Sequence, residues 1–464
     1  MARIEAPSLR DYVANTPTDN SFFDRLVSVR IADINRGTSL DGWVTDLTGR
    51  SVLIATASQL TTALALIELD GRARRLTVLP PNADPNHFPA VLAGAEIDSA
   101  VIDRDTPEWL TRNLASPTFF CRPSIVAAEE PPAASFRSEW LLLTSGTTGA
   151  PKLVAHTLAD LTAAIKARSP ADGAAVWATF YDIRRYGGLQ IFLRALLGGA
   201  SLILSCEAEP VGEHLARLGR HGVTHLSGTP SHWRQALMNS AIRNVAPRYV
   251  RLSGEIADQT LLDALRTVFP NATVGHAFAS TEAGVAFDVN DGLAGFPVDY
   301  VGCIRDGVEM KVADGSLHIR SPRLATRYVG TQQPLVDKDG FVDTGDIVER
   351  RGDRYYFVGR KDGVINIGGM KVHPEEVEAI INGHPMVRMS LVRSKKSPIT
   401  GSVLVADIVL RPKGESTDTQ HKLLKEEILR HCREALPRHK IPALISFVSN
   451  LSVATTGKMA RSWG

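Results

Sequence analysis

The most informative stretch of the chain is Thr144-Ser145-Gly146-Thr147-Thr148-Gly149-Ala150-Pro151-Lys152, which directly follows the apolar segment Trp140-Leu141-Leu142-Leu143. Glycines let the backbone turn its N–H groups inward around an anion, hydroxyl side chains add donors, and lysine adds a mobile positive charge. The stretch therefore predicts a loop that holds a polyphosphate. It differs from the usual nucleoside triphosphatase loop, in which Gly-Lys-Ser/Thr opens a helix, because Pro151 precedes Lys152 and no hydroxyl follows it.

Length and composition set the broad class. A chain of 464 residues exceeds what one hydrophobic core usually serves, so we expect two or more domains. Its 52 basic and 50 acidic side chains are balanced and demand neither nucleic acid nor a membrane. We find no apolar signal core at the start and no apolar run long enough to span a bilayer. The four cysteines show no paired spacing, so we expect a reduced, cytoplasmic protein.

Apolar runs alternate with helical patterns in two parts of the chain, before and after the glycine-rich loop. The expected strands lie at 52–55, 76–79, 100–102, 200–204 and 224–227, and the expected helices at 60–69 and from Thr157 onward. Strands that alternate with helices indicate parallel α/β sheets. We therefore predict two α/β sub-units that lie side by side.

The pattern changes after Val301. Short alternating segments separated by turn signals continue to Arg360, which indicates a β-rich subdomain. The tail beyond Asp362 contains a helix that begins near Pro374 and an amphipathic segment over 423–435, which suggests a small α+β unit. The predicted fold class is therefore α/β, with a large N-terminal domain over residues 1–359 and a small C-terminal domain over 360–464.

Four further segments fall in an order and spacing that, with the opening loop, are typical of one superfamily. They are Phe278-Ala279-Ser280-Thr281-Glu282, Asp343-Thr344-Gly345-Asp346, the stretch from Gly359 through Gly368-Gly369 to Glu376, and Thr455-Thr456-Gly457-Lys458. Over nearly its full length the chain resembles the adenylate-forming enzymes: acyl-CoA synthetases, adenylation domains of peptide synthetases, and luciferases. It is most similar to a stand-alone AMP-dependent acyl-CoA synthetase. The resemblance implies that ATP activates a carboxylic acid to an acyl-adenylate, with release of pyrophosphate, and that the acyl group passes to the thiol of coenzyme A.

The resemblance also implies roles for the residues around the phosphates. A carboxylate that attacks the α-phosphorus brings anions together, so cations and positioned donors must offset their repulsion. The loop from Thr144 to Gly149, with Lys152, would wrap the β- and γ-phosphates. Thr281 would bind the α-phosphate, and Glu282, with Thr144, would bind Mg²⁺, which accepts a single carboxylate and shares the phosphates as ligands.

Lys458 is the lysine that the resemblance identifies as catalytic, alongside Thr281 and Glu282. A compact ammonium on a flexible stem can contact both the attacking carboxylate and the bridging oxygen as charge develops. Asp346 would accept hydrogen bonds from both ribose hydroxyls, since one carboxylate has two oxygens for two donors. Arg360 would reinforce the ribose or phosphate side.

The adenine side departs from the family pattern. Phe278-Ala279 replaces the usual Tyr-Gly, which keeps an aromatic face for the base but loses a hydroxyl. Gly254-Glu255 resembles the segment that meets the adenine edge. His276 either touches the base or packs in the core. Trp233 likewise either lines the acyl pocket or packs in the core.

The family works in two stages, with a mobile small domain that rotates between them. Asp362 stands where the hinge belongs, because hinges concentrate backbone change at element ends. Gly368 and Gly369 would form the wall of the thiol tunnel, although a plain tight turn explains the same two residues.

The acyl pocket is the least conventional part of the sequence. Its expected substrate-binding residues are Tyr181, Asp182, Arg185 and Ser253. The carboxylate of Asp182 either binds a substrate ammonium, as in amino-acid-activating members, or pairs with Arg184 or Arg185, since buried charges are normally paired. The two arginines suggest a polar or anionic feature nearby.

Three functions stay open at this level. The first is a CoA ligase that uses ATP, Mg²⁺, coenzyme A and a small-molecule carboxylic acid. The second is an enzyme that loads an amino or aryl acid onto the phosphopantetheine of a separate carrier protein. The third is a silent nucleotide-binding protein, which the retained phosphate loop, Glu282, Asp346 and Lys458 disfavour. The acid itself, whether amino, aryl, fatty or dicarboxylic, is not determined.

Overall fold

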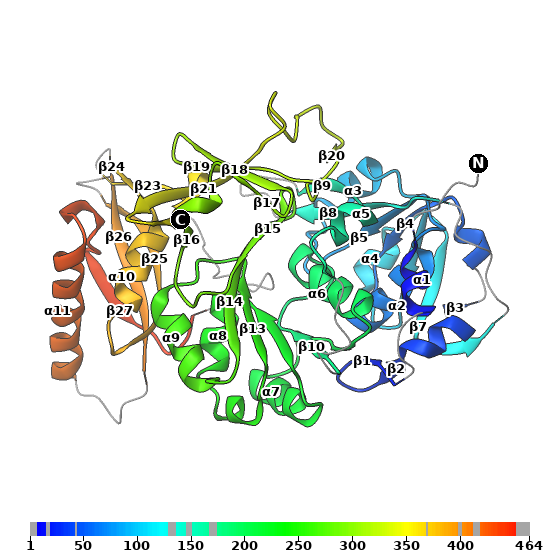
Figure 1. The fold of residues 1–464 in the computed structure, drawn as a ribbon, viewed down its shortest axis with the longest axis horizontal. Coiled ribbons are helices and arrows are strands. Elements are labelled where there is room, and N and C mark those ends of the chain that lie inside the picture. Colours follow the sequence, from blue (N-terminus) through cyan, green and yellow to red (C-terminus); the bar gives the residue numbers. More distant parts are fainter. Residues whose placement is uncertain are drawn as a thin grey trace.

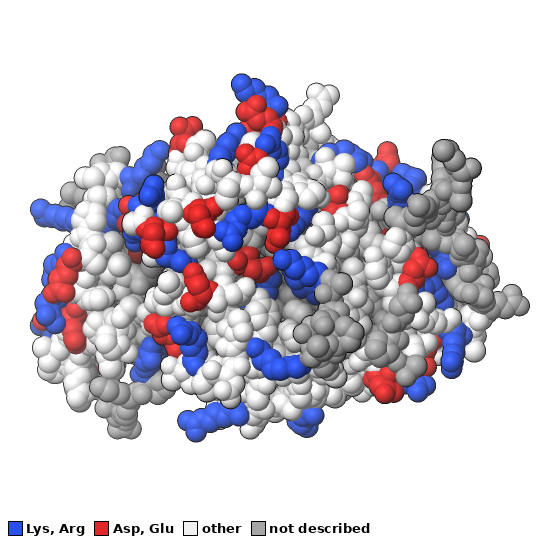
Figure 2. All heavy atoms as spheres, in the orientation of Figure 1, with Lys and Arg blue, Asp and Glu red and all other residues white. Residues whose placement is uncertain are grey.

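The structure is a computed structural model that describes residues 7–14, 19–41, 44–128, 136–144, 151–166, 174–367, 370–397, 401–411 and 418–451. A large N-terminal domain contains two eight-stranded sheets and a six-stranded sheet, and a small C-terminal domain lies at the left of Figure 1. The predicted α/β class, with a large and a small domain, is confirmed. Basic and acidic side chains are interspersed over the face in Figure 2, in keeping with the balanced charge of the chain.

The first sub-unit is a sheet in the order β20-β9-β8-β5-β4-β6-β7-β3. Its strands are β3 (Gly37–Leu40), β4 (Ser51–Ile54), β5 (Arg75–Val78), β6 (Ser99–Ile102), β7 (Thr118–Ala127), β8 (Glu139–Thr144), β9 (Lys152–Thr157) and β20 (Arg327–Val329). Its helices are α2 (Gln59–Leu69), α3 (Phe88–Gly94), α4 (Glu108–Arg112) and α5 (Leu158–Thr162). The strands predicted in this region are confirmed as parallel neighbours, β5-β4-β6, with apolar residues buried along their length.

The second sub-unit is a sheet in the order β15-β14-β13-β12-β10-β11-β1-β2. Its strands are β1 (Ser21–Phe23), β2 (Ser28–Arg30), β10 (Val176–Thr179), β11 (Ser201–Ile203), β12 (His225–Gly228), β13 (Tyr249–Ser253), β14 (Thr273–Ser280) and β15 (Gly284–Val289). Its helices are α6 (Tyr186–Leu197), α7 (Val211–Arg220), α8 (Pro230–Ala236) and α9 (Gln259–Val268). Strands β12, β13 and β14 are parallel, so their carboxyl ends meet at one edge, where open α/β sheets bind ligands.

The first fifty residues contribute to both sheets. Strand β1 pairs in parallel with β11 of the second sheet, and β3 pairs antiparallel with β7 of the first. Helix α1 (Leu9–Ala14) packs its buried Leu9 and Val13 into the core that α2 and α6 share. The segments are three to six residues long, too short to show a clear period in the sequence. The N-terminal segment therefore ties the two sub-units together.

The β-rich subdomain is a sheet in the order β16-β22-β21-β19-β18-β17. Its strands are β16 (Phe296–Pro297), β17 (Ile304–Arg305), β18 (Val308–Ala313), β19 (Ser316–Arg320), β21 (Val342–Arg351) and β22 (Arg354–Arg360). Both turn residues between β18 and β19 have positive φ, 51° at Asp314 and 75° at Gly315, as a two-residue hairpin requires. Glycine tolerates this region and aspartate is among the residues that adopt it, so the turn signal in the sequence was sound.

The small domain has a hydrophobic core of its own, formed by residues between Ile365 and Ile445. Its elements are β23 (Ile365–Ile367), β24 (Met370–Val372), α10 (Pro374–Asn382), β25 (Val387–Ser397), β26 (Gly401–Leu410), α11 (Asp418–Ala435) and β27 (Leu444–Phe447). The helix at Pro374 begins where the sequence placed it, with proline at its first position. No described helix is long and apolar enough to cross a membrane.

Candidate active site

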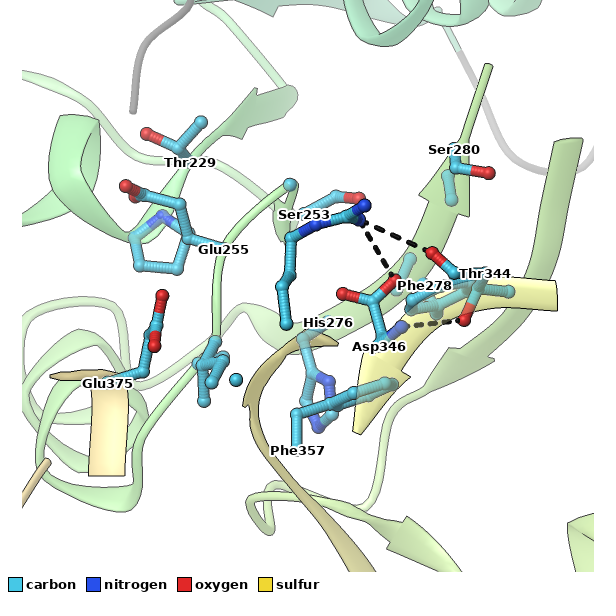
Figure 3. Close-up of a pocket in the computed structure, with 18 of the residues that line it drawn as sticks. Thr229, Ser253, Glu255, His276, Phe278, Ser280, Thr344, Asp346, Phe357 and Glu375 are labelled. Carbon is cyan, nitrogen blue, oxygen red and sulfur yellow. Dashed lines mark hydrogen bonds and ion pairs between the residues drawn. The ribbon is translucent and has the colours of Figure 1, made fainter. Parts of the chain in front are cut away.

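The carboxyl ends of β12, β13 and β14 open into a cavity of about 1730 Å³. The large domain contributes the starts of α6 and α8, the end of β8 and the hairpin β21–β22, and the small domain contributes α10. Figure 3 shows side chains from these elements pointing toward a common space, with Asp346 and Phe278 on one side and Glu255 and Glu375 on the other. Residues far apart in the sequence therefore share one chamber.

Asp346 lies on β21 opposite Arg360 on β22. The two side chains form an ion pair at 3.5 Å between Arg360 Nη1 and Asp346 Oδ2, and Arg360 Nη1 also donates to the carbonyl oxygen of Thr344 at 3.4 Å (Figure 3). Burial lowers the pKa of Arg360, but the carboxylates of Asp346 and Asp362 outweigh it and raise that pKa above its ordinary value. The hairpin thus presents a carboxylate whose position is fixed by a permanently charged neighbour.

Phe278 lies on β14 and belongs to an aromatic group at this end of the cavity. Its ring stacks with Phe357 at 5.2 Å and 8° between planes, and with Phe287 at 5.9 Å and 17°. Phe357 lines the cavity as well, although the sequence motifs did not point to it. His276 also lines the cavity, and its Nε2 hydrogen-bonds the carbonyl of Leu293 at 3.0 Å. The predicted adenine contact at Phe278 thus belongs to a stacked aromatic wall.

Lys152 and Glu282 meet around Tyr328. Lys152 Nζ donates to Gln333 Oε1 at 3.1 Å and lies 4.7 Å from the centre of the Tyr328 ring. The Tyr328 hydroxyl hydrogen-bonds Glu282, and burial together with that carboxylate raises the pKa of Tyr328 to about 12. Thr281 lines the same cavity. Residues 145–149 of the predicted phosphate loop lie outside the described residues.

Glu282 and Thr144 both line the cavity, and both offer oxygen donors. These donors fit Mg²⁺, which takes one or two protein oxygens and completes its shell with phosphates and water. The described residues contain no cluster of three or more His, Cys, Asp or Glu side chains that could hold a metal unaided. A metal at this site would therefore depend on the nucleotide for most of its ligands.

Gly254 and Glu255 follow β13 and line the cavity. Gly254 has φ of 89°, a backbone conformation that favours glycine. The Glu255 carboxylate accepts hydrogen bonds from the backbone N of Ser231 at 2.8 Å and from its hydroxyl at 3.0 Å, in the first turn of α8. Acidic groups stabilise helix N-termini in this way, so Glu255 has a structural role besides its predicted nucleotide contact.

Asp182 pairs with Arg184, one of the two alternatives that the sequence left open. Arg184 Nη2 donates to Asp182 Oδ2 at 2.6 Å and Nε donates to Oδ1 at 2.9 Å, with both side chains about nine-tenths buried. Arg184 Nη1 also donates to the carbonyls of Thr56 and Ala57. This bidentate pair holds the Asp182 carboxylate inside the protein, so Asp182 is a poor candidate for binding a substrate ammonium.

Arg185 is the N-cap residue of α6 and lines the cavity. Its Nη2 donates to Asn82 Oδ1, and its Nε is buried without a hydrogen-bond partner among the described residues. Burial lowers the pKa of Arg185 below its ordinary range, although Asp182 acts in the opposite sense. Of the two neighbouring arginines, Arg184 and Arg185, it is therefore Arg185 that lines the cavity.

Tyr181 and Ser253 join the acyl side of the cavity to the end of β13. The Tyr181 hydroxyl donates to the carbonyl oxygen of Ser253 at 2.8 Å, and both residues line the cavity. Trp233 is fully buried in the core of the second sub-unit, with its Nε1 donating to the Arg251 carbonyl at 3.2 Å. Trp233 is thus a core residue, which answers the question left open by the sequence.

Arg251, Gln190 and Ser227 line the cavity, and sequence reasoning missed all three. Arg251 is the middle residue of β13, and it lies in register with Ser227 on β12. A signal for Arg251 was present, because a charged residue inside an otherwise apolar buried strand needs a partner or a ligand. Gln190 lies in the second turn of α6, where only the packing of that helix against the sheet shows which way it faces.

The residues assigned to the second stage are only partly described. Asp362 lies in a 3₁₀ turn, η6 (Lys361–Gly363), and accepts a hydrogen bond from Arg360 Nε at 3.0 Å. Arg360 therefore connects the predicted ribose contact to the predicted hinge. Gly368, Gly369 and Lys458 lie outside the described residues.

Comparisons with known proteins agree on one family. The family model described as AMP-binding enzyme matches residues 52–329, and the model of the AMP-binding enzyme C-terminal domain matches residues 376–458. The chain is 30% identical to the 2-succinylbenzoate–CoA ligase of Salmonella typhimurium over 257 residues, which cover 54% of each protein. It is 24% identical to 4-coumarate–CoA ligase 3 of Arabidopsis thaliana over 352 residues, which cover 69% of this chain and 61% of that one.

The chain thus spans between half and two thirds of these curated relatives. Solved structures match along nearly their whole length. A benzoate CoA ligase from Burkholderia xenovorans has a TM-score of 0.81 at 19% identity, covering 98% of this chain and 99% of that one. The anthranilate CoA ligase AuaEII has a TM-score of 0.78 at 19% identity, covering 99% and 97%. At such identity these two structures establish the fold.

Proposed function

Because the chain belongs to the AMP-binding enzyme family, we propose that it is an AMP-forming acid–thiol ligase that converts a carboxylic acid to its coenzyme A thioester. The observation that carries this proposal is the single cavity in which Lys152 and Glu282, the pair Asp346–Arg360, and the acyl-side residues Tyr181 and Arg185 lie together. A nucleotide and an acid could occupy such a chamber at the same time.

In the first step a carboxylate oxygen of the acid attacks the α-phosphorus of ATP, and the bond to pyrophosphate breaks. Lys152 and the loop before it would hold the β- and γ-phosphates, and Thr281 the α-phosphate. Asp346 would orient the ribose. Mg²⁺, held by Glu282 and Thr144, would offset the negative charge of the phosphates. Positioning and electrostatic stabilisation provide most of the rate in such a transfer.

In the second step the thiol sulfur attacks the acyl carbonyl carbon, the bond to AMP breaks, and the thiol proton leaves to solvent. We assign the change between steps to a rotation of the small domain, residues 360–464, about Asp362. Lys458 would serve the first step, and Gly368 and Gly369 would line the path of the pantetheine thiol in the second. The hydrogen bond from Arg360 Nε to Asp362 ties this hinge to the nucleotide side.

Coenzyme A is the acceptor we favour over a carrier protein. Both curated relatives described above are named as CoA ligases. A Salinispora arenicola protein described as a probable non-canonical nonribosomal peptide synthetase, CymA, also matches at 26% identity over 92% of this chain and 6% of its own length, so loading of a carrier protein is the second candidate.

The test is ATP–pyrophosphate exchange with the purified chain across amino, aryl, fatty and dicarboxylic acids. We expect exchange that depends on the acid, with AMP as the nucleotide product. The thioester would then be identified by mass with coenzyme A and, separately, with a pantetheinylated carrier protein. If none of the acids supports exchange, the chain is a silent nucleotide-binding protein. If the products are ADP and a phosphorylated acid, it is a phosphotransferase.

A further inference from the structure

The floor of the acyl side holds a buried guanidinium with unfilled hydrogen-bonding capacity. Arg251 is 6% exposed and lines the cavity from the middle of β13. Its Nη2 lies 2.8 Å from Asp288 Oδ1, while its Nε is buried and has no hydrogen-bond partner among the described residues. A buried donor without a partner is costly, so it points to water or to a ligand group in the cavity.

A second guanidinium shares the same counter-charge. Arg194, on α6, has buried Nε and Nη2 atoms that lack partners within the described part of the chain. Burial and then the charge of Arg251 lower the pKa of Arg194 to about 10, and Asp288 acts against them. Asp288 is also the carboxylate that acts on Arg251. Arg251, Arg194 and Asp288 together thus carry one net positive charge.

The surroundings add to this excess. Arg185 brings a third guanidinium to the cavity, and Asp182, the carboxylate with the larger effect on it, is held by Arg184 at 2.6 Å. Ser227 is 1% exposed and neighbours Arg251 in register, and its buried hydroxyl also lacks a partner among the described residues. The floor therefore offers a positive charge and donors to whatever fills it.

Ile191, Ala277 and Val285 line the cavity too, and they give the acyl side an apolar wall next to this charged floor. An ammonium group would meet repulsion from these guanidinium groups, because Asp182 and Asp288 are already paired with arginines. A plain hydrocarbon tail would leave the guanidinium desolvated and unmatched. A carboxylate would complete the charge balance and accept hydrogen bonds from Arg251 and Ser227.

We propose that the acid activated by this protein is a dicarboxylic acid, whose second carboxylate binds at the floor formed by Arg251 and Ser227. This proposal rests on the proposed ligase function and names its substrate class. The first carboxylate would reach the α-phosphate, the apolar wall would pack against the carbons between, and Arg185 would add a longer-range attraction.

The test compares matched acids in ATP–pyrophosphate exchange with the complete chain. The probes are linear diacids from butanedioate to octanedioate and the benzenedicarboxylates. Each is paired with its monomethyl ester, which keeps the size and removes the second charge, and with the monoacid that ends in methyl. We expect kcat/KM for at least one diacid to exceed that of its ester by about tenfold or more, the value of one charge-assisted hydrogen bond.

Two variants move the preference in opposite directions. Arg251→Gln should reduce the diacid-to-ester ratio by about tenfold, and Asp288→Asn, which frees Arg251 from its counter-charge, should raise the ratio. Arg248→Gln is the matched control, since Arg248 is exposed just before β13 and should leave the ratio unchanged. Circular dichroism would show whether Arg251→Gln folds. If it does not, the diacid-to-ester ratio would be measured in Asp288→Asn and in the conservative variant Arg251→Lys instead.

The possible results separate the dicarboxylate proposal from the ligase function. Exchange that is equal for diacids and their esters, or that occurs only with amino or fatty acids, overturns the dicarboxylate proposal and leaves the ligase function in place. If none of the acids supports exchange, both the ligase function and this proposal are overturned. A loss of exchange in Arg251→Gln that affects esters and diacids alike would show a purely structural role for Arg251.

Discussion

The two ends of the cavity are built in different ways. At the proposed nucleotide end, Asp346 and Arg360 stand opposite each other on one hairpin and form an ion pair at 3.5 Å, and Arg360 also binds Asp362 at 3.0 Å. At the proposed acyl end, Arg251 on β13 pairs with Asp288 on β15 at 2.8 Å, and Arg194 on α6 lies within the electrostatic influence of both. The proposed nucleotide end is therefore built from neighbouring strands of one hairpin, whereas the proposed acyl end combines charged groups that only the packing of separate elements brings together.

The largest effect should come from Lys458→Ala, which tests the nucleotide end. Removal of a cation from a developing charge should lower acyl-adenylate formation by about 10²–10³-fold. Thioester formation from a preformed adenylate should be retained. Pyrophosphate release and thioester yield would be measured separately, with Lys422→Ala, an exposed lysine of α11, as the control. Unchanged pyrophosphate release would remove Lys458 from the mechanism.

Asp346→Ala should raise KM for ATP to the same extent whichever acid is the substrate. Loss of a carboxylate that receives two ribose hydroxyls should raise KM for ATP by roughly 10- to 100-fold, the value of one or two charge-assisted hydrogen bonds. The ratio between diacid and monoacid should not move, because that ratio belongs to the other end. Asp337→Asn, in an exposed turn before β21, is the matched control. A changed acid preference would contradict the separation of the two ends.

Asp362→Pro tests whether a backbone change at Asp362 separates the adenylation step from the thioester step. Proline fixes φ, so a hinge that must change its backbone would lose about tenfold or more in the thioester step, while adenylation is spared. Single-turnover measurements of adenylate and thioester would separate the steps. Equal loss in both would argue that Asp362 matters through its contact with Arg360 and not as a hinge.

Tyr181→Phe is a smaller change at the acyl end. It removes the hydrogen bond to the Ser253 carbonyl at 2.8 Å, which is worth about 1 kcal/mol, or about fivefold. We expect KM for the acid to rise by that factor and KM for ATP to stay constant. A steady-state matrix over both substrates would show it, and a change confined to ATP would reverse the assignment of Tyr181.

The smallest effect on catalysis should come from the packing behind the acyl end. There Glu209 accepts hydrogen bonds from Arg217 Nε at 2.9 Å and Nη2 at 2.7 Å, and contacts His214 at 2.9 Å. Burial raises the pKa of Glu209, but these partners outweigh it and lower that pKa to about 2. The ring of His214 packs against the ring of Phe180, the residue before Tyr181, with 5.4 Å between the ring centroids.

A carboxyl group whose pKa is depressed in the folded state stabilises the protein above its unfolded pKa and loses that contribution as pH falls through the folded value. The free energy of unfolding should therefore decline from about pH 4.3 toward pH 2. Glu209→Gln should flatten this decline and leave acid selectivity at pH 7 unchanged. Urea denaturation across pH would measure it, and an unaltered slope would contradict the role given to Glu209.

Much of the nucleotide end could be predicted because its residues lie in short local motifs. Gly345 and Asp346 are adjacent on β21, and Thr281 and Glu282 follow β14, the strand that carries Phe278, so one short segment of chain places each group. The prediction was incomplete where a contact depends on another element. Glu255 also binds the first turn of α8, and Phe357 joins Phe278 from a different strand.

The α/β class and the β-rich subdomain could be predicted from the sequence, and the phosphate and ribose contacts could be proposed from it, because hydrophobic period, turn chemistry and local motifs act over a few residues. The folded structure was needed to show that Asp182 pairs with Arg184, that Trp233 packs in the core and that Arg251 lines the cavity. Charge balance in a buried site is a sum over elements brought together by folding. Neighbours along the chain do not reveal that sum.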